Sequence, residues 1–301
     1  MFLILAQVLM TAIISYIALK KHASIQSEAF LVGLMMLGLL YIIRMNPFTP
    51  AEEYFLAIAA AFILPVVILI VIFITFATGR VEIKVVNNKT YIDEVKRKTF
   101  HLIALALFVP KHLYRQIYNF VIDGTYATFG IFITKRDEGF LCLLLFAVAL
   151  ALLMLFTFIE FLRLNYKPAI FGVLLREKEL NQLASYLYSA AAVYLVALLF
   201  FPHDDIVAAA IAIAFLADLA ACIIGKKCRR IALNDRSLEG FLANFITGSL
   251  AGYLIVGWIA IPASLIVAIL DFINGASRIA INDNILFPLL AALSLSLMTS
   301  L

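Results

Sequence analysis

The sequence has few charged residues and few cysteines for its length. Only 14% of its 301 residues are Asp, Glu, Lys or Arg, whereas a soluble domain carries about 25%. Its three cysteines, Cys142, Cys222 and Cys228, are scattered along the chain, so they provide neither a disulfide framework nor the paired spacing of a zinc site. These shortages exclude an ordinary soluble domain and a small disulfide-rich secreted scaffold.

Two common motifs are also missing. The chain has no G-x-x-x-x-G-K-[ST] phosphate loop and no kinase-type Gly-rich loop, so any nucleotide site must be of another kind. The first 21 residues lack the basic region and the small-residue cleavage site of a signal peptide. We therefore interpret them as a retained helix.

Apolar residues dominate what is present. They make up 65% of the chain, the mean hydropathy is +1.07, and long apolar runs recur at about the ~20 residues that cross a bilayer as a helix. The sequence predicts an all-α, polytopic integral membrane protein with about ten transmembrane helices. The predicted spans are 2–19, 29–44, 54–78, 99–110, 139–163, 183–202, 206–225, 241–258, 259–275 and 285–301.

The distribution of basic residues predicts the orientation. If the region 99–138 crosses the membrane once, most of the 23 Lys and Arg residues fall on one side. Cytoplasmic loops carry the excess of Lys and Arg, so this side is predicted to be cytoplasmic and the N-terminus external. A second crossing within 99–138 would invert everything downstream.

One carboxylate stands inside a predicted span. Asp218 belongs to the stretch "FLADLAACIIGKKCRR" and lies seven residues before Gly225, about 10 Å from the cytoplasmic end of the helix. A carboxylate in a membrane helix is costly and usually functional. Asp218 is therefore the first candidate site residue.

The segment "DEVKRKTFHL" places Glu94, Arg97, Lys98 and His101 on one face of a helix. Taken alone, this cluster also fits an ordinary basic cap at a helix start, and a lone histidine is more often a satisfied buried residue. The shared face favours a functional cluster on the cytoplasmic side.

Two further charged segments follow. Glu160 and Arg163 close one span at the spacing of an intrahelical pair. Arg176 and Glu179 come next, in a segment that fits a solvated charged loop as well as a site.

A basic loop joins two predicted spans. The helix ending at Gly225 is followed by Lys226 and further basic residues, and "NDRSLEG" then opens the next helix with cap-forming residues. Basic side chains beside a helix N-terminus form an anion site. A positive-inside anchor loop would explain the basic residues, but not Asp218 or Glu239.

The last cluster lies in "ILDFINGASRIAINDNILFPL". Asp271 is an acid near the end of an apolar helix, and Asp283 and Asn284 open the final span, where Asp283 would alternatively serve as a helix cap. Basic groups hold phosphates, and Mg²⁺ commonly binds one or two carboxylates together with substrate phosphates. The clusters together predict phosphoryl transfer, in which positioning and charge neutralisation supply most of the catalysis.

From about Glu94 to Pro288 the chain resembles the CTP-dependent polyprenol kinases, which include dolichol, phytol and farnesol kinases and the yeast-type CTP-dependent diacylglycerol kinase. Six motifs carry the resemblance: "EVKRKTFH", "IEFLRL", "REKE", "ADLAACIIGKK", "RSLEG" and "DNILFP". Departures from the pattern include Ala217 in place of a glycine, Arg236 in place of a lysine, and Asp271 where the family usually has Glu. The three predicted helices of the N-terminal region 1–80 lie outside the resemblance, which implies a membrane-embedded kinase domain at 81–301.

The implied reaction transfers the γ-phosphate of CTP to a membrane isoprenoid alcohol and releases CDP, with Mg²⁺ as cofactor and no nucleic-acid partner. The expected catalytic residues are Asp218, Arg97, Lys98, His101 and Asp271. The expected nucleotide-binding residues are Lys226, Arg236, Ser237, Glu239, Gly240, Gly225, Arg176 and Glu179. The expected metal ligands are Asp218, Asp283 and Asn284, and either Asp218 or His101 would be the general base.

The alternatives are a CDP-lipid synthase, which needs the same CTP and Mg²⁺ but releases pyrophosphate, and a kinase acting on diacylglycerol, phytol or geranylgeraniol. A transporter with Asp218 and Asp271 on its substrate path, or a catalytically inactive assembly subunit, would also carry such residues. The sequence leaves the lipid alcohol and the oligomeric state open.

Overall fold

The computed structural model describes residues 98, 149–150, 152–160, 163, 183–200, 203–228, 231–233, 236–274 and 282–300. The predicted spans 2–19, 29–44, 54–78 and 99–110 lie outside these residues. Only part of the predicted span 139–163 is described, and residues 152–160 of it are helical.

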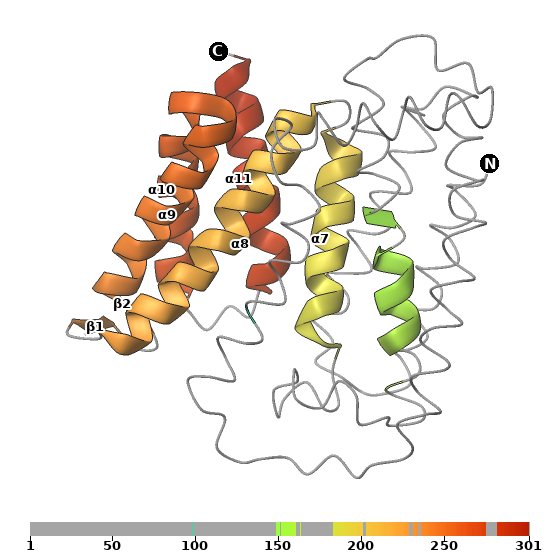
Figure 1. The fold of residues 1–301 in the computed structure, drawn as a ribbon, viewed down its shortest axis with the longest axis horizontal. Helices are drawn as coiled ribbons and strands as arrows, with labels where there is room; N and C mark the ends of the chain where they lie inside the picture. Colours follow the sequence, from blue (N-terminus) through green and yellow to red (C-terminus); the bar gives the residue numbers. More distant parts are fainter. Residues whose placement is uncertain are drawn as a thin grey trace, which may run out of the picture.

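The described part is helical, and its helices fall where the apolar runs predicted them. They are α7 (Ser185–Leu199), α8 (Asp204–Lys227), α9 (Leu238–Val256), the 3₁₀ turn η3 (Gly257–Ile259), α10 (Ala260–Asn274) and α11 (Asp283–Thr299) (Figure 1). Each lies within a few residues of a predicted span. Long apolar runs form helices because a helix satisfies its own backbone hydrogen bonds in an apolar environment.

Two residue pairs depart from the all-α expectation. β1 (Ala232–Leu233) pairs antiparallel with β2 (Arg236–Ser237), with Ala232 opposite Ser237 and Leu233 opposite Arg236. This short hairpin joins α8 to α9, and the amide of Leu238 donates to the carbonyl of Ile231 at its base. The hairpin fixes the position of the Arg236 side chain, which lies directly before α9.

α8 and α9 pack antiparallel through small residues. A Cβ added at Gly225 would lie 3.1 Å from the Cα of Gly240, and a Cβ at Gly248 would lie 3.4 Å from the Cβ of Ala217. A Cβ at Gly252 would lie 2.9 Å from the Cδ1 of Ile213. The absence of side chains on α9 at these positions lets the two helices approach closely, as small residues do between membrane helices.

α9 and α10 form a helical hairpin. Gly257 reverses the chain with φ 73° and ψ −149°, a conformation open essentially only to glycine. Contacts between α9 and α10 show that the two helices are antiparallel. Ser264 Oγ donates to the carbonyl of Phe245 at 3.2 Å, and Asn244 donates to Asp271, which is farther from the Gly257 turn. The hairpin therefore returns α10 to the end of the bundle at which α9 starts.

α11 contacts α7, α8 and α10, and its buried face adds Ile285, Phe287, Ala291 and Leu295 to the core. α7 is buried along almost its whole length, with Tyr194, Leu187 and Leu195 among the largest fully buried side chains. The core thus lies around α7, α8 and α11, whereas α9 and α10 pack on its flank.

Two helical stretches are long and apolar enough to cross a membrane, Asp204–Lys227 and Leu238–Ile273. The second is the α9–α10 hairpin, so it consists of two shorter antiparallel arms. Its large exposed apolar residues are Leu238, Leu242, Ile246, Leu250, Tyr253, Leu254, Trp258, Leu265, Ile266, Ile269 and Ile273. An apolar surface of this extent is typical of a membrane or protein interface, which agrees with the membrane character predicted from the sequence.

Candidate active site

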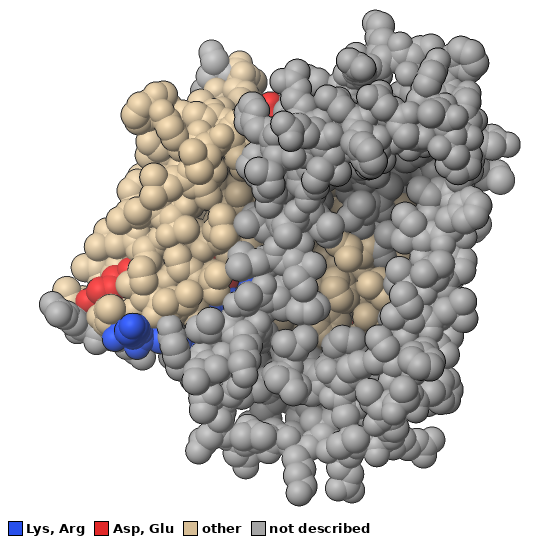
Figure 2. Space-filling model, viewed as in Figure 1, with Lys and Arg blue, Asp and Glu red and all other residues tan. Residues whose placement is uncertain are grey.

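Most of the charged residues of α8, α9, α10, α11 and the β1–β2 hairpin lie toward one end of the helix bundle. The C-terminal end of α8, the β1–β2 hairpin and the N-terminal ends of α9 and α11 all lie at the lower end of Figure 1. Figure 2 shows blue and red atoms together where α8 ends and α9 begins, whereas most of the other described surface in that view is tan. The antiparallel packing of successive helices causes this convergence.

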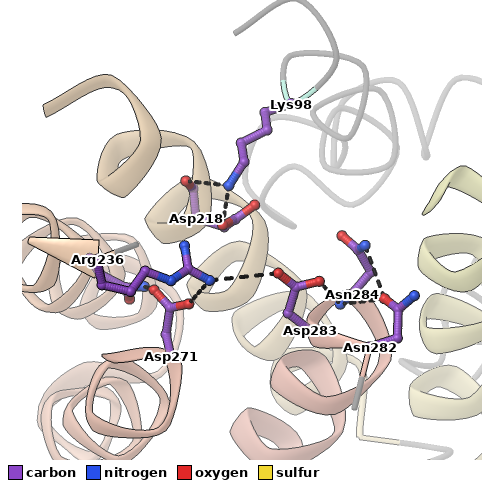
Figure 3. A network of polar contacts seen from close by, with 8 residues as sticks. Lys98, Asp218, Arg236, Asp271, Asn282, Asp283 and Asn284 are labelled. Carbon is purple, nitrogen blue, oxygen red and sulfur yellow. Dashed lines mark hydrogen bonds and ion pairs between the residues drawn. The ribbon is translucent and has the colours of Figure 1, made fainter. Parts of the chain in front are cut away.

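Asp218 lies on α8 and is paired with Lys98. The Lys98 ammonium contacts Asp218 Oδ1 as an ion pair and also donates to the Asp218 carbonyl at 3.2 Å (Figure 3). The side chains are 9% and 15% exposed, respectively. This contact joins residues 120 positions apart and brings together two residues that the sequence placed in separate clusters.

Asp271 lies near the end of α10 and is 3% exposed. Its Oδ2 accepts a 3.0 Å hydrogen bond from the side-chain amide of Asn244 on α9, which is 1% exposed. Its Oδ1 lies 2.6 Å from Arg236 Nη2. That contact is an ion pair without hydrogen-bond alignment, so it holds the carboxylate mainly by charge.

Arg236 stands between two carboxylates from different helices. Besides Asp271, its Nη2 lies 3.7 Å from Oδ2 of Asp283, as Figure 3 shows. The guanidinium, which is 27% exposed, thus links the β hairpin to the end of α10 and the start of α11. Asp218, Asp271 and Asp283 carry one more charge than Lys98 and Arg236 together.

The start of α11 is capped by a residue that the sequence analysis did not name. The side chain of Asn282 accepts from the backbone N–H of Asn284 at 3.1 Å, and so does Asp283 Oδ1. The Asn284 side-chain amide also donates to Asn282. Asn282 is therefore the N-cap, and Asp283 keeps its other oxygen directed toward Arg236.

The predicted nucleotide-binding residues at the α8–α9 junction have structural roles. Ser237 caps α9 by accepting from the Gly240 amide at 3.1 Å and donates to the Gly225 carbonyl at 3.2 Å. Gly225 and Gly240 lie where the two helices touch, because a Cβ on Gly225 would be 3.1 Å from Gly240 Cα. Glu239 Oε1 accepts from the Ile231 amide at 3.2 Å. The two glycines thus set the helix spacing, so that the hairpin and Arg236 lie beside Asp271.

Lys226 lies in the last turn of α8 and is exposed, where a basic residue complements the helix dipole. Arg97, His101, Arg176 and Glu179 lie outside the described residues, so their predicted roles stay predictions. The sequence analysis missed Asn244, although it is the sole Asn in the mainly apolar helix 238–256. That isolation was an available signal.

Glu160 and Arg163 form a second buried cluster at the start of α7. Arg163 donates to both carboxylate oxygens of Glu160 at 2.9 and 2.5 Å, and the two residues are 2% and 0% exposed. Glu160 also accepts from the Ala184 amide at 3.0 Å and from the Tyr186 hydroxyl. Since Ala184 is the N-cap of α7, the carboxylate caps that helix from another part of the chain.

The residues around Asp218 fit a divalent cation bound together with phosphates rather than a cage made of protein ligands. The described residues contain no group of three or more His, Cys, Asp or Glu side chains spaced to hold a metal ion. Their donors are nevertheless carboxylate and amide oxygens, the ligands that Mg²⁺ prefers, and Mg²⁺ typically takes one or two carboxylates with water and substrate oxygens. Asp218 and Asp283 are the residues that would hold it.

The Lys98–Asp218 pair and the contacts of Arg236, Asn244, Asp271 and Asp283 lie close together toward one end of the four helices α8 to α11. A scan of protein-family models found no match to this chain, and neither did searches of curated proteins and of solved structures.

Proposed function

We propose that this protein is a CTP-dependent lipid kinase that phosphorylates a membrane isoprenoid alcohol, dolichol or another polyprenol, and releases CDP. The observation that carries the proposal is the convergence of Asp218, Asp271 and Asp283 with Lys98 and Arg236 at one end of an apolar helix bundle. The choice of CTP as donor and of an isoprenoid alcohol as acceptor rests on the resemblance of the sequence motifs.

The pairing of charges supports a site that exchanges counterions when it binds nucleotide. Lys98 pairs with Asp218, and Arg236 is shared by Asp271 and Asp283, so two of the three negative charges are neutralised. A triphosphate carries several negative charges and accepts charge-assisted hydrogen bonds from Lys and Arg. When these side chains turn to the phosphates, the carboxylates are left to bind a cation, so the nucleotide and Mg²⁺ are expected to bind together.

The transfer itself is a displacement at phosphorus. The oxygen of the alcohol forms a bond to the γ-phosphorus while the bond from that phosphorus to the β–γ bridging oxygen breaks, and CDP leaves with the electron pair. The hydroxyl proton passes to a carboxylate of the site or to His101. Bound Mg²⁺ would neutralise charge on the phosphate oxygens, and Lys98 and Arg236 would stabilise the charge that develops on the leaving group.

The arrangement of the bundle supports a lipid acceptor. The α9–α10 hairpin exposes an apolar surface, and the polar site lies at the end of the same hairpin. An alcohol with its chain among apolar helices and its hydroxyl at their ends would meet a nucleotide arriving from the aqueous side. We propose that this side is the cytoplasm and that the protein is multi-pass, as the basic residues predict.

The second candidate function is that of a CDP-lipid synthase, because cytidylyl transfer to a phosphatidate-like lipid needs the same nucleotide and cation. Membranes containing this protein should be incubated with Mg²⁺, a panel of polyprenols, phytol, geranylgeraniol, diacylglycerol and phosphatidate, and CTP labelled at either the γ- or the α-phosphate. Label from the γ-position in the lipid supports the kinase. Label from the α-position, or no lipid labelling with any alcohol, would contradict it.

A further inference from the structure

Asn244 is buried on α9 at the centre of the polar site. Its side chain is 1% exposed, and its amide N–H donates to Asp271 Oδ2 at 3.0 Å. Its carbonyl oxygen Oδ1 is buried and accepts no hydrogen bond in the described part of the chain. A buried acceptor without a donor costs about 1–3 kcal/mol, so this oxygen is suited to a donor from beyond the described residues.

The position of Asn244 fits a lipid headgroup. It lies six residues after Leu238, the first residue of α9, and Asp271 lies three residues before Asn274, the last of α10. At ~1.5 Å per residue these positions are about 5–9 Å inside the helix ends. The opposite face of α9, two residues away on either side, is apolar and exposed, with Leu242 at 46% and Ile246 at 53%.

The chemistry of the pair favours one class of ligand. Asn244 Oδ1 is an acceptor, and Asp271 beside it is an acid that contacts Arg236 at 2.6 Å. A neutral hydroxyl donates to such an acceptor, whereas an anionic phosphate offers acceptors and is repelled by the carboxylate. A hydroxyl bound here would also lie near Arg236, the residue proposed to hold the nucleotide.

We infer that Asn244 is the binding determinant for the hydroxyl group of the lipid acceptor, which donates to Asn244 Oδ1 while the Asn244 amide holds Asp271 in place. This inference rests on the proposed function and deepens it, because it assigns the acceptor as a neutral alcohol rather than a lipid phosphate. Phosphorylation converts the hydroxyl into an ester oxygen that has no hydrogen to donate. The product therefore loses this contact, and the repulsion from Asp271 assists its release.

The test measures binding without turnover. Purified protein in nanodiscs is titrated with farnesol, farnesyl methyl ether and farnesyl phosphate in competition with a labelled farnesol, with no CTP present. The methyl ether keeps the chain and the oxygen but has no donor hydrogen. We expect the native protein to bind the alcohol about tenfold more tightly than the ether, and the phosphate more weakly than the alcohol.

Asn244→Leu should remove this preference, so that the alcohol and the ether bind equally. Ser264→Ala is the matched control, because it removes a hydrogen bond between the same two helices at a position away from Asp271, and it should keep the tenfold ratio. Circular dichroism and thermal unfolding check that each variant is folded. Should Asn244→Leu not fold, Asn244→Ala and the ratio in the native protein carry the test.

Equal affinities for the alcohol and the ether in the native protein, or an unchanged ratio in Asn244→Leu, would overturn the inference. The proposed function fails independently of this result. If the native protein prefers the alcohol but never transfers phosphate from CTP, the hydroxyl subsite is supported and the kinase assignment is contradicted. If the native protein transfers phosphate but Asn244→Leu keeps the same preference for the alcohol over the ether, the kinase assignment is supported and the role of Asn244 is contradicted.

Discussion

The pair formed by Asp218 and Lys98 offers the sharpest single test of the site. Asp218→Asn keeps the size and shape of the side chain but removes its charge. Lys98 is 7% exposed, so its ammonium is left nearly buried without the carboxylate. It keeps the 3.2 Å hydrogen bond to the backbone carbonyl of residue 218, which the substitution does not affect.

The magnitudes follow from this geometry. Removing one partner of a buried ion pair costs about 3–5 kcal/mol, and the retained backbone bond and the 15% exposure of the Asp218 side chain reduce the expected loss of unfolding free energy to about 1–3 kcal/mol. The rate of γ-phosphate transfer should fall about 100-fold to 1,000-fold, as it does when one charge-stabilising group is removed from an active site. Unfolding in detergent and labelled-CTP turnover measure the two effects separately.

The double variant Lys98→Met/Asp218→Leu separates a structural pair from a catalytic one. Replacing both charges by apolar side chains should restore the unfolding free energy to within about 1 kcal/mol of the native value, because neither charge is then buried alone. Activity should stay lost. Asp205→Asn, at the other end of α8, is the control for activity and should leave turnover unchanged. A double variant, or Asp218→Asn alone, that turns over at the native rate would refute the assignment.

Four further predictions concern packing and charge. Gly248→Ala places a Cβ against Ser264 Oγ and should lower the unfolding free energy by about 1–3 kcal/mol; Ser264→Gly added to it should restore stability, and a stable single variant would contradict the close packing. Glu160→Gln leaves the 2%-exposed Arg163 without its carboxylate and should cost about 3–5 kcal/mol, measured by unfolding, whereas a native melting curve would exclude a supporting role. Arg236→Lys keeps the charge but loses the planar fork that faces two carboxylates, so the KM for CTP should rise about tenfold; an unchanged KM would argue against nucleotide contact. Chelation with EDTA should abolish transfer and added Mg²⁺ should restore it, so activity that survives chelation would contradict the proposed cation.

Several features of the described fold follow from the sequence because they are local. The helices α7 to α11 lie close to the apolar runs, since a long apolar segment forms a helix whatever its neighbours are. Ser237 was expected near a helix start and is the N-cap of α9, because a cap depends on the residues within one turn. Asp283 was considered as a cap for α11, but Asn282 occupies that position, one residue before the acid.

The roles of Gly225 and Gly240 could not be predicted from the residues that surround them in the sequence. In the sequence, Gly225 and Gly240 resemble parts of a nucleotide-binding loop. In the structure the two glycines lie against each other between α8 and α9. Whether a glycine contacts a ligand or a neighbouring helix depends on which segment packs against it, and that information is held in another part of the chain.

By itself, the sequence determined an apolar helical chain with acids near the helix ends, because composition and periodicity are properties of each segment. Only the tertiary structure decided that Lys98 pairs with Asp218, that Arg236 stands between Asp271 and Asp283, and that Asn244 bonds Asp271. These contacts depend on the register between helices, which the small residues of α8, α9 and α10 fix through their close packing. Which side chains pair depends on how neighbouring helices are aligned, and the sequence of a single helix does not contain that information.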